Sequence, residues 1–225
     1  MPAKASAKTA KPARVVIVED HQMVREWLGR MICEDGTFTV CGEADNIQSA
    51  LAIIQRTQPD VIILDLTLRG SSGLELLKDL LAQEIEIPVL VLSMHEESLY
   101  AERALRAGAR GYISKQADSS TLFKALRAVL SGEIYLDGPT NSLLLEKFVR
   151  PGARKGGGLE TLSDRELEVF QLMGKGVPKR EIVRQLGLGE ATVDTYQARI
   201  KEKLGLRNSA ELYAFAARWV EEHGG

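Results

Sequence analysis

The sequence predicts an α/β domain with a doubly wound, five-stranded parallel sheet, followed by a small all-α domain of four helices. Between about residues 14 and 132, short apolar runs alternate with amphipathic stretches, which is the pattern of parallel strands joined by crossover helices. After a glycine-rich break at 151–158, only helical patterns follow. Two domains are therefore expected in these 225 residues.

The strands of the first domain are predicted from apolar runs, which are continuous because both faces of a parallel sheet are covered. They are expected at Val15–Val18, Phe38–Cys41, Val61–Leu64, Pro88–Leu92 and Gly111–Ile113. In a doubly wound sheet of order 2-1-3-4-5, the first and third strands are neighbours, and ligands bind at the carboxyl edge.

Five helices are predicted to accompany the five strands. The first has a stripe of apolar residues at helical spacing that is expected to face the sheet, formed by Val24, Trp27, Leu28, Met31 and Ile32. In the last, Leu122, Leu126 and Val129 repeat in the same way, and Ser119 or Ser120 is expected to cap its start.

Start and stop signals divide the second domain into four helices. A capping box at Ser163–Glu166 opens the first, Pro178 lies where the second begins, and a turn is expected at Gly187–Gly189. The third helix is predicted at Glu190–Leu204. The fourth, at about Ser209–Val220, has Leu212, Phe215, Ala216 and Trp219 on one face.

The domain boundaries are expected as a flexible basic tail at 1–13, a first domain at 14–132, a linker at 133–159 and a second domain at 160–225. The tail lacks acidic residues and a hydrophobic segment, which argues against a secretory signal, and a transit peptide is the alternative interpretation. A short helix is expected at Ser142–Phe148 within the linker.

The composition excludes several classes of protein. Its 29 basic and 31 acidic residues leave a net charge of −2, so any contact with nucleic acid must come from a local basic patch. Two cysteines are too few for a disulfide framework or a cysteine metal cage. No apolar run reaches the length of a membrane span. A cytoplasmic protein without membrane contact is expected.

Three carboxylates follow strands that are neighbours in the predicted sheet. Glu19 and Asp20 come directly after the first strand, and Asp65 comes directly after the third. We expect them to converge at the carboxyl edge, where a hard divalent cation such as Mg²⁺ would relieve their repulsion. Such an ion can also neutralise phosphoryl oxygens while a carboxylate oxygen attacks phosphorus.

Ser93 and Lys115 follow the fourth and fifth strands, so a hydroxyl and an ammonium group are expected at the same edge, where both can bind phosphoryl oxygens. Each residue alone has an ordinary interpretation. Asp20 could be only a helix N-cap, and Tyr112 could be ordinary strand packing. The occurrence of these residues at consecutive strand ends favours one common site.

The first domain resembles the receiver domain of two-component response regulators from Arg14 to about Gly132. The resemblance rests on Val16-Ile-Val-Glu-Asp-His21, Pro59-Asp-Val-Ile-Ile-Leu-Asp65-Leu66, Leu92-Ser93 and Gly111-Tyr-Ile-Ser-Lys115. It implies that Asp65 is the phospho-acceptor and that Lys115 pairs with the phosphoryl group. It also implies a switch pair, Ser93 and Tyr112, and an Mg²⁺ site made by Glu19, Asp20, Asp65 and the backbone carbonyl of Thr67.

The chain departs from the receiver pattern in the loop after the acceptor. Leu68 and Arg69 stand where the family often has Met-Pro, and Gln116 follows the lysine where many receivers have proline. Neither change removes a catalytic atom. Without the proline the loop is expected to be less rigid, which would alter the phosphorylation rate or the partner kinase.

The third helix of the second domain has the features of a DNA-reading helix. Val193, Tyr196, Ile200 and Leu204 are expected to form a buried stripe, and a helix exposed after a short turn can enter the major groove. Any single basic residue nearby is more commonly a solvated charge. As a group, the candidates for phosphate contact are Lys179, Arg180, Arg184, Arg199, Lys201, Lys203 and Arg207.

The second domain resembles the LuxR-type helix-turn-helix domain, which identifies the chain as similar to the NarL/FixJ class of regulators. The resemblance rests on Leu162-Ser-Asp-Arg-Glu-Leu-Glu-Val-Phe170, Gly176-Val-Pro-Lys-Arg-Glu-Ile182, Ala191-Thr-Val193 and Lys203-Leu-Gly-Leu-Arg207, together with Ile200. It implies that Asp194, Thr195 and Ala198 lie nearest the bases. The family usually has Lys-x-His where this chain has Asp194-Thr-Tyr196.

These resemblances predict a DNA-binding transcription regulator and not an enzyme. A sensor histidine kinase would phosphorylate Asp65 with Mg²⁺, which would change dimerisation and binding to double-stranded DNA, with a homodimer expected in the phosphorylated form. An alternative is an atypical regulator that is independent of phosphorylation and uses the receiver only to dimerise. A phosphatase of the haloacid-dehalogenase type is disfavoured, because it needs a second Asp where this chain has Thr67.

Overall fold

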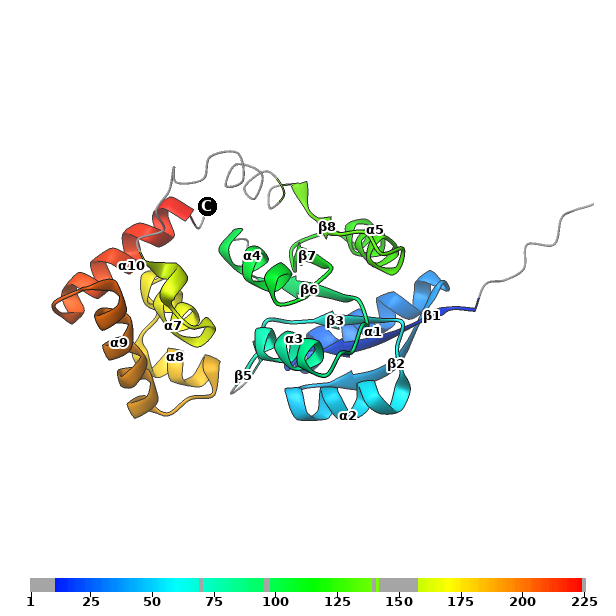
Figure 1. Cartoon of the computed structure of the whole chain (residues 1–225), viewed down its shortest axis with the longest axis horizontal. Helices are drawn as coiled ribbons and strands as arrows, with labels where there is room; N and C mark the ends of the chain where they lie inside the picture. The colour runs from blue at the N-terminus through cyan, green and yellow to red at the C-terminus, as the bar shows by residue number, and fades with distance from the viewer. Residues whose placement is uncertain (1–10, 69–70, 95–97, 139–140, 142–157, 224–225) are drawn as a thin grey trace, which may run out of the picture.

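The computed structural model describes residues 11–68, 71–94, 98–138, 141 and 158–223, and in them a sheet domain precedes a helical domain (Figure 1). The parallel sheet has the order β2-β1-β3-β6-β7-β8, so its first five strands follow the predicted order and confirm the fold class. The strands are β1 (Ala13–Val18), β2 (Phe38–Ala44), β3 (Val61–Leu64), β6 (Val89–Ser93), β7 (Gly111–Ser114) and β8 (Tyr135–Leu136).

Two short features of the sheet domain were not predicted. β8 pairs in parallel with β7 and adds a sixth strand within residues expected to form the linker. An antiparallel hairpin, β4 (Thr67–Leu68) with β5 (Ser71–Ser72), follows β3. The tail and linker boundaries stay predictions.

The helices of the sheet domain cover both faces of the sheet. One buried cluster joins alternate β1 residues, Val15 and Ile17, to the helices on one face, and a second joins Val16 and Val18 to those on the other. Because helices cover both faces of the sheet, the central strands are continuous apolar runs. The helices are α1 (Gln22–Asp35) and α5 (Ser119–Leu130) on the first face, with α2 (Ile47–Thr57), α3 (Gly73–Ala82) and α4 (Ser98–Arg106) on the second.

Two details predicted for these helices are wrong. Trp27 is 53% exposed, whereas Leu28 and Ile32 are buried, because the contact of α1 with the sheet is narrower than the apolar stripe. The cap of α5 is Asp118, whose carboxylate accepts the Thr121 N–H at 2.7 Å, and not Ser119 or Ser120. The helix predicted at 142–148 lies outside the described residues.

The helices of the second domain lie close to their predicted positions. The elements of this domain are a 3-10 turn η1 (Leu159–Thr161), α7 (Asp164–Gly174), α8 (Lys179–Leu186), α9 (Glu190–Leu204) and α10 (Ser209–His223). The predicted capping box is confirmed: the Ser163 hydroxyl accepts the Glu166 N–H, and the Glu166 carboxylate accepts the Ser163 N–H. Pro178 occupies the N-cap position of α8 without a side-chain capping bond, and the turn at 187–189 separates α8 from α9.

Aromatic packing and one close helix contact hold this domain together. The Phe170 ring lies 5.8 Å from the Phe215 ring and 5.9 Å from the Trp219 ring. A Cβ on Gly174 would stand 2.4 Å from the Ala216 carbonyl oxygen, so glycine lets α7 approach α10 closely. Within the described part of the chain, every helix is too short or too polar to cross a membrane.

Candidate functional site

The predicted acidic residues lie together at the carboxyl edge of the sheet. Glu19 and Asp65 directly follow β1 and β3, whose pairing in register from Val15↔Val61 to Val18↔Leu64 brings the two strand ends side by side. Both carboxylates are buried, with 1% and 3% exposure. Ligand atoms of Glu19, Asp20, His21 and Asp65 all lie within 4.8 Å of one another. The predicted convergence of the three acids is therefore observed.

Lys115 bridges the two buried carboxylates. Its Nζ lies 2.6 Å from Glu19 Oε2 and 2.8 Å from Asp65 Oδ2, and its side chain is only 11% exposed. Lys115 follows β7, and its backbone N–H donates to the Ser93 carbonyl at 2.8 Å, which fixes where the side chain starts. The ammonium thus compensates part of the buried negative charge.

Burial and crowding perturb the titration of this cluster. Burial raises the pKa of Asp65 to about 6, against the opposing attraction of Lys115 and with a further increase from Glu19. Burial alone would lower the pKa of Lys115, but Asp65 and Glu19 together raise it above 10.5. The two pKa values rise for different reasons: burial raises that of Asp65, whereas two neighbouring carboxylates raise that of Lys115 against the effect of burial.

The donor set fits a hard divalent cation. Three carboxylates supply oxygen ligands, the type that Mg²⁺ prefers. The Thr67 N–H donates to Asp65 Oδ1 at 3.2 Å, so the loop that holds Thr67 lies directly against the acceptor carboxylate. His21 was not predicted in this cluster: its Nδ1 lies 2.9 Å from Asp20 Oδ1, and the adjacent position in the sequence was the only signal.

The predicted switch residues are buried beside this cluster. Ser93 ends β6 and is fully buried, and Tyr112 lies in β7 with no exposed surface. The pairing of β6 with β7 aligns Ser93 with Ser114, the residue before Lys115. Both predicted residues therefore come from the strands that hold the lysine.

The predicted DNA-reading helix α9 has an exposed face. Asp194, Thr195, Ala198 and Arg199 are exposed, and Lys201 is partly exposed, whereas Val193 and Ile200 are fully buried. Tyr196 and Leu204 are only partly buried, so the buried stripe is narrower than predicted. The exposed face of α9 follows the short turn after α8, as a helix-turn-helix requires.

Several predicted phosphate-binding residues make ion pairs within the domain. Lys179 Nζ lies 2.6 Å from Asp194 Oδ1, which links α8 to α9. Arg184 pairs with Glu181 on α8, and Lys203 pairs with the capping residue Glu166 at 2.6 Å. Three further candidates are exposed to solvent: Arg180, Arg199 and Arg207. Lys203 thus already stabilises the start of α7.

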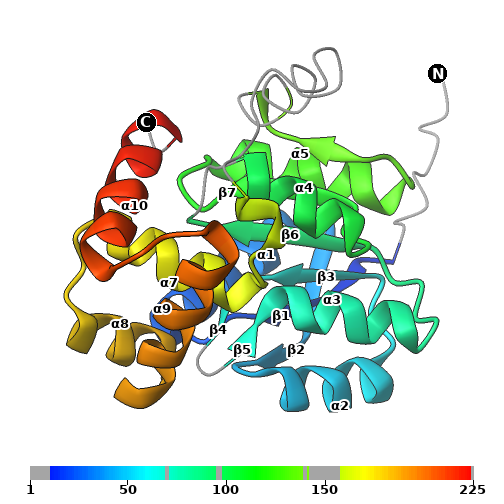
Figure 2. The same ribbon diagram turned by 60° about the vertical axis from the view of Figure 1, so that its left-hand side comes forward.

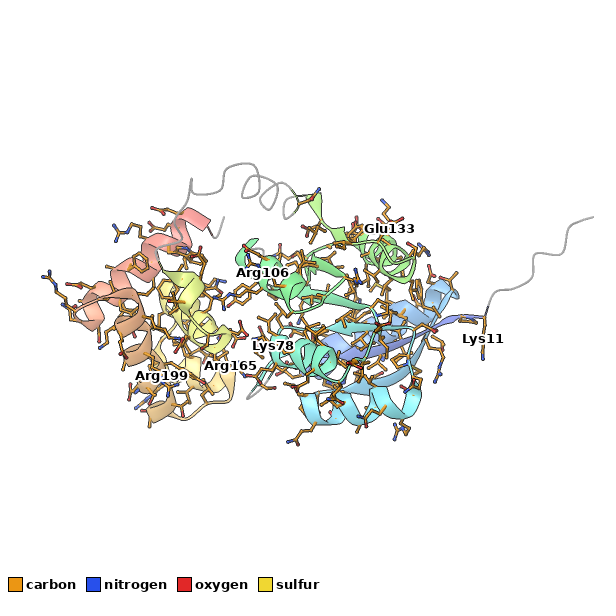
Figure 3. The ribbon with its side chains drawn as sticks, viewed as in Figure 1. Lys11, Lys78, Arg106, Glu133, Arg165 and Arg199 are labelled. Atoms are coloured by element: carbon orange, nitrogen blue, oxygen red, sulfur yellow. The ribbon has the colours of Figure 1, made fainter. Side chains whose placement is uncertain are left out.

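The two domains meet where the first turn of α7 lies against the sheet domain (Figures 1 and 2). Asp164 binds Lys78 at 2.7 Å and Arg103 at 2.9 Å, and Arg165 donates to the Leu68 carbonyl at 3.1 Å. Figure 3 shows Arg165 and Lys78 at this junction, and Arg199 on α9. This contact could not be predicted from the sequence, because its residues have the composition of an ordinary solvated helix start.

Comparison with known proteins decides the family. A family model described as the response regulator receiver domain matches residues 15–127, and a model described as bacterial regulatory proteins of the LuxR family matches residues 160–216. The chain belongs to the response regulators with a LuxR-type DNA-binding domain. It is therefore a DNA-binding transcription regulator, and the family is not one of enzymes.

Relatives of this regulator match it over nearly its whole length. A putative transcriptional regulator of Pseudomonas aeruginosa is 38% identical over 92% of this chain and 98% of the relative. The DNA-binding transcriptional activator DevR/DosR of Mycobacterium tuberculosis is 32% identical over 90% of this chain and 93% of the relative. RcsB of Salmonella enterica, solved on a promoter with the phosphomimetic BeF₃⁻, shares the fold at 24% identity, with a TM-score of 0.60, 92% coverage of this chain and 99% of its own.

Proposed function

We propose that this regulator acts in the cytoplasm, that it accepts a phosphoryl group on Asp65 from a sensor histidine kinase, and that phosphorylation changes its dimerisation and DNA binding. The observation that carries the proposal is the buried cluster of Glu19, Asp65 and Lys115. Two buried carboxylates held by one ammonium are costly to maintain for structure alone, which supports a functional role.

The chemistry follows from the same residues. An oxygen of the Asp65 carboxylate attacks phosphorus, an O–P bond forms, and the P–N bond of the donor phosphohistidine breaks, so that the imidazole leaves with the electron pair. When held by Glu19, Asp20, Asp65 and the Thr67 carbonyl, Mg²⁺ would neutralise charge on the phosphoryl oxygens. The Lys115 ammonium, already 2.8 Å from Asp65, pairs with the phosphoryl group once it is attached.

The response then involves Ser93 and Tyr112, which adjoin the cluster. The Ser93 hydroxyl binds a phosphoryl oxygen, and Tyr112 fills the space behind it, which shifts an existing equilibrium of the adjoining loops. We further propose that phosphorylated copies pair as a homodimer, since helix-turn-helix proteins commonly bind two half-sites on double-stranded DNA. The exposed face of α9 would read the bases through Asp194, Thr195 and Ala198, with basic residues of α8 and α9 on the phosphates.

Replacement of the acceptor tests the proposal. The Asp65→Asn variant should take up no label from a phosphodonor in the presence of Mg²⁺, because an amide is too weak a nucleophile for the transfer. Asp60→Asn is the matched control, since Asp60 lies at the opposite end of β3, where it accepts the Arg14 N–H. Labelling of Asp60→Asn should equal that of the native protein.

The same experiment distinguishes this proposal from the alternative of a regulator that is independent of phosphorylation. Labelling that persists in Asp65→Asn would contradict the assignment of the acceptor. If the native protein takes up label but binds DNA with the same affinity in both forms, DNA binding is independent of phosphorylation, and the receiver acts only as a dimerisation surface. A titration of operator DNA with labelled and unlabelled protein measures this difference.

A further inference from the structure

The imidazole of His21 lies against two carboxylates of the acidic edge. Its Nδ1 is 2.9 Å from Asp20 Oδ1 and 3.2 Å from Glu19 Oε1. Both acidic side chains are buried, with 5% and 2% exposure, whereas the imidazole is 62% exposed. The second oxygen of Glu19 binds Lys115 at 2.6 Å, so His21 and Lys115 face different oxygens of the same carboxylate.

The backbone fixes His21 in this position. Its N–H donates to Glu19 Oε1 at 3.1 Å, and its carbonyl accepts the Arg25 N–H of α1 at 3.0 Å. His21 is the N-cap of α1, but its side chain makes no capping hydrogen bond. An N-cap is usually Ser, Thr, Asp or Asn, whose oxygen accepts a helix N–H. The imidazole therefore contacts the acids and does not cap the helix.

The spacing of these atoms suits a shared metal ion. Neighbouring ligands of an octahedral ion, each about 2.1 Å from it, lie about 3.0 Å apart, which is close to both distances from Nδ1. Ligand atoms of His21 and the three acids all lie within 4.8 Å of one another. Three carboxylates and the Lys115 ammonium leave two negative charges, which a divalent ion balances. A neutral imidazole adds a ligand and no charge.

We propose that His21 is a fourth ligand of this metal centre, so that the centre binds divalent transition ions such as Co²⁺ more tightly than its oxygen ligands alone would allow. The inference rests on the metal site of the proposed function and not on phosphoryl transfer. Carboxylate oxygens suit Mg²⁺, whereas an imidazole nitrogen suits transition ions. To bind a metal, Nδ1 presents its lone pair while the ring proton is on Nε2. His21 thus sets which ions the centre holds.

The alternative role of His21 is to neutralise the acids as a hydrogen-bond donor. In that role the imidazole does not contact the ion, so its replacement would change the binding of every divalent ion in the same way. A metal ligand has a different effect, because the loss of a nitrogen donor weakens the binding of transition ions and not that of Mg²⁺. Selectivity between ions therefore distinguishes the two roles.

The test compares Co²⁺ and Mg²⁺ binding to the full chain, without an affinity tag, by isothermal titration calorimetry. In His21→Asn an amide oxygen replaces the imidazole nitrogen, and asparagine favours the N-cap position, so α1 should stay folded. The dissociation constant for Co²⁺ should rise about tenfold or more, as it does when even the residues around metal ligands are replaced. The dissociation constant for Mg²⁺ should stay close to the native value, because the amide supplies an oxygen.

Proton NMR of the Co²⁺-bound protein gives a second measurement. A histidine that ligates Co²⁺ has an exchangeable N–H resonance shifted far outside the normal range by the paramagnetic ion. This resonance should be present in the native protein and absent from His21→Asn. His223→Asn, at the end of α10, is the matched control and should keep the resonance and both affinities. Asp20→Asn should bind both ions more weakly, since the carboxylate belongs to the same centre.

Three results would overturn the role of His21 as a ligand: native Co²⁺ affinity in His21→Asn, an equal loss of affinity for Co²⁺ and Mg²⁺, or a shifted resonance that persists in His21→Asn. The metal site of the proposed function would stand in each case, provided that the native protein binds Mg²⁺. If the native protein binds neither ion, or if Asp20→Asn binds both as the native protein does, the metal site itself fails and the inference fails with it.

Discussion

At the scale of single residues, Asp194 is the feature that most distinguishes the DNA-binding face. It lies on the exposed side of α9 at 60% side-chain exposure, and its carboxylate binds Lys179 at 2.6 Å. A carboxylate facing DNA is repelled by phosphates, although it can accept a hydrogen bond from cytosine N4. The ion pair neutralises the carboxylate but withdraws one lysine from contact with the DNA backbone.

We predict that Asp194→Asn binds all duplexes more tightly at low salt, because it removes one negative charge and frees Lys179 for a phosphate. Each additional phosphate that the variant neutralises should steepen the slope of log K against log salt by about 0.9. Titrations of specific and random duplexes at several salt concentrations measure this slope. Glu221→Gln, which removes an exposed charge from α10, is the control, and an equal change in both variants would argue against the Lys179 mechanism.

At the scale of elements, the junction of β3 with α3 sets the position of the acceptor. Gly73 begins α3, and its N–H donates to the Leu66 carbonyl at 2.7 Å. A Cβ at this position would lie 2.2 Å from the Asp65 carbonyl oxygen and 2.8 Å from the Leu66 Cα. Both atoms are backbone and cannot rotate away, so the loop can stay this close to α3 only because residue 73 lacks a side chain.

Gly73→Ala is therefore expected to displace the backbone of Asp65. The free energy of unfolding should fall by about 1–3 kcal/mol, the usual cost of overpacking, and uptake of label on Asp65 should fall with it. Chemical denaturation and phosphodonor labelling measure the two effects. Gly29→Ala on α1 is the control: its new Cβ would meet only the end of Glu43 at 3.4 Å, and alanine favours a helix, so stability should be equal or higher.

At the scale of the whole molecule, the two domains share one apolar cluster and a buried polar junction. Burial raises the pKa of Glu168 to about 7, although Arg165 and Ser72 oppose the rise, and Asp164 adds to it. Asp164 itself faces Lys78 and Arg103 from the sheet domain. Separation of the domains would return Glu168 to water and to an ordinary pKa near 4.5.

The contact between the helical domain and the sheet domain should therefore depend on pH. The pKa of Glu168 is higher while the two domains are in contact, so protonation of Glu168 stabilises the contact. This stabilisation is complete below about pH 4.5 and is lost as the pH rises through 7. The total loss is on the order of 3 kcal/mol. The radius of gyration should increase between pH 5 and pH 8 in the native protein, and Glu168→Gln, which imitates the protonated form, should not respond. A pH response that survives in Glu168→Gln would assign it to another group.

Much of the candidate site could be predicted because its residues follow consecutive strands. Once the strand order is known, Glu19, Asp65 and Lys115 must share one edge of the sheet. The capping box at Ser163 likewise predicted the first residue of α7 correctly. Prediction failed where the burial of a side chain depends on contacts with residues that are distant in the sequence. Trp27 has the right spacing for a buried stripe, but nothing in the sequence tells how wide the contact of α1 with the sheet is.

The sequence by itself determined the two domains, the order of the five predicted strands, the acidic edge and the helix that faces outward, because each depends on periodicity or on position relative to a strand or helix end. Only the tertiary structure decided that Lys179 pairs with Asp194 and that Arg165 binds the Leu68 carbonyl, 97 residues away. Such contacts depend on how finished domains and helices come together, and a solvated arginine and a buried one have the same sequence signature.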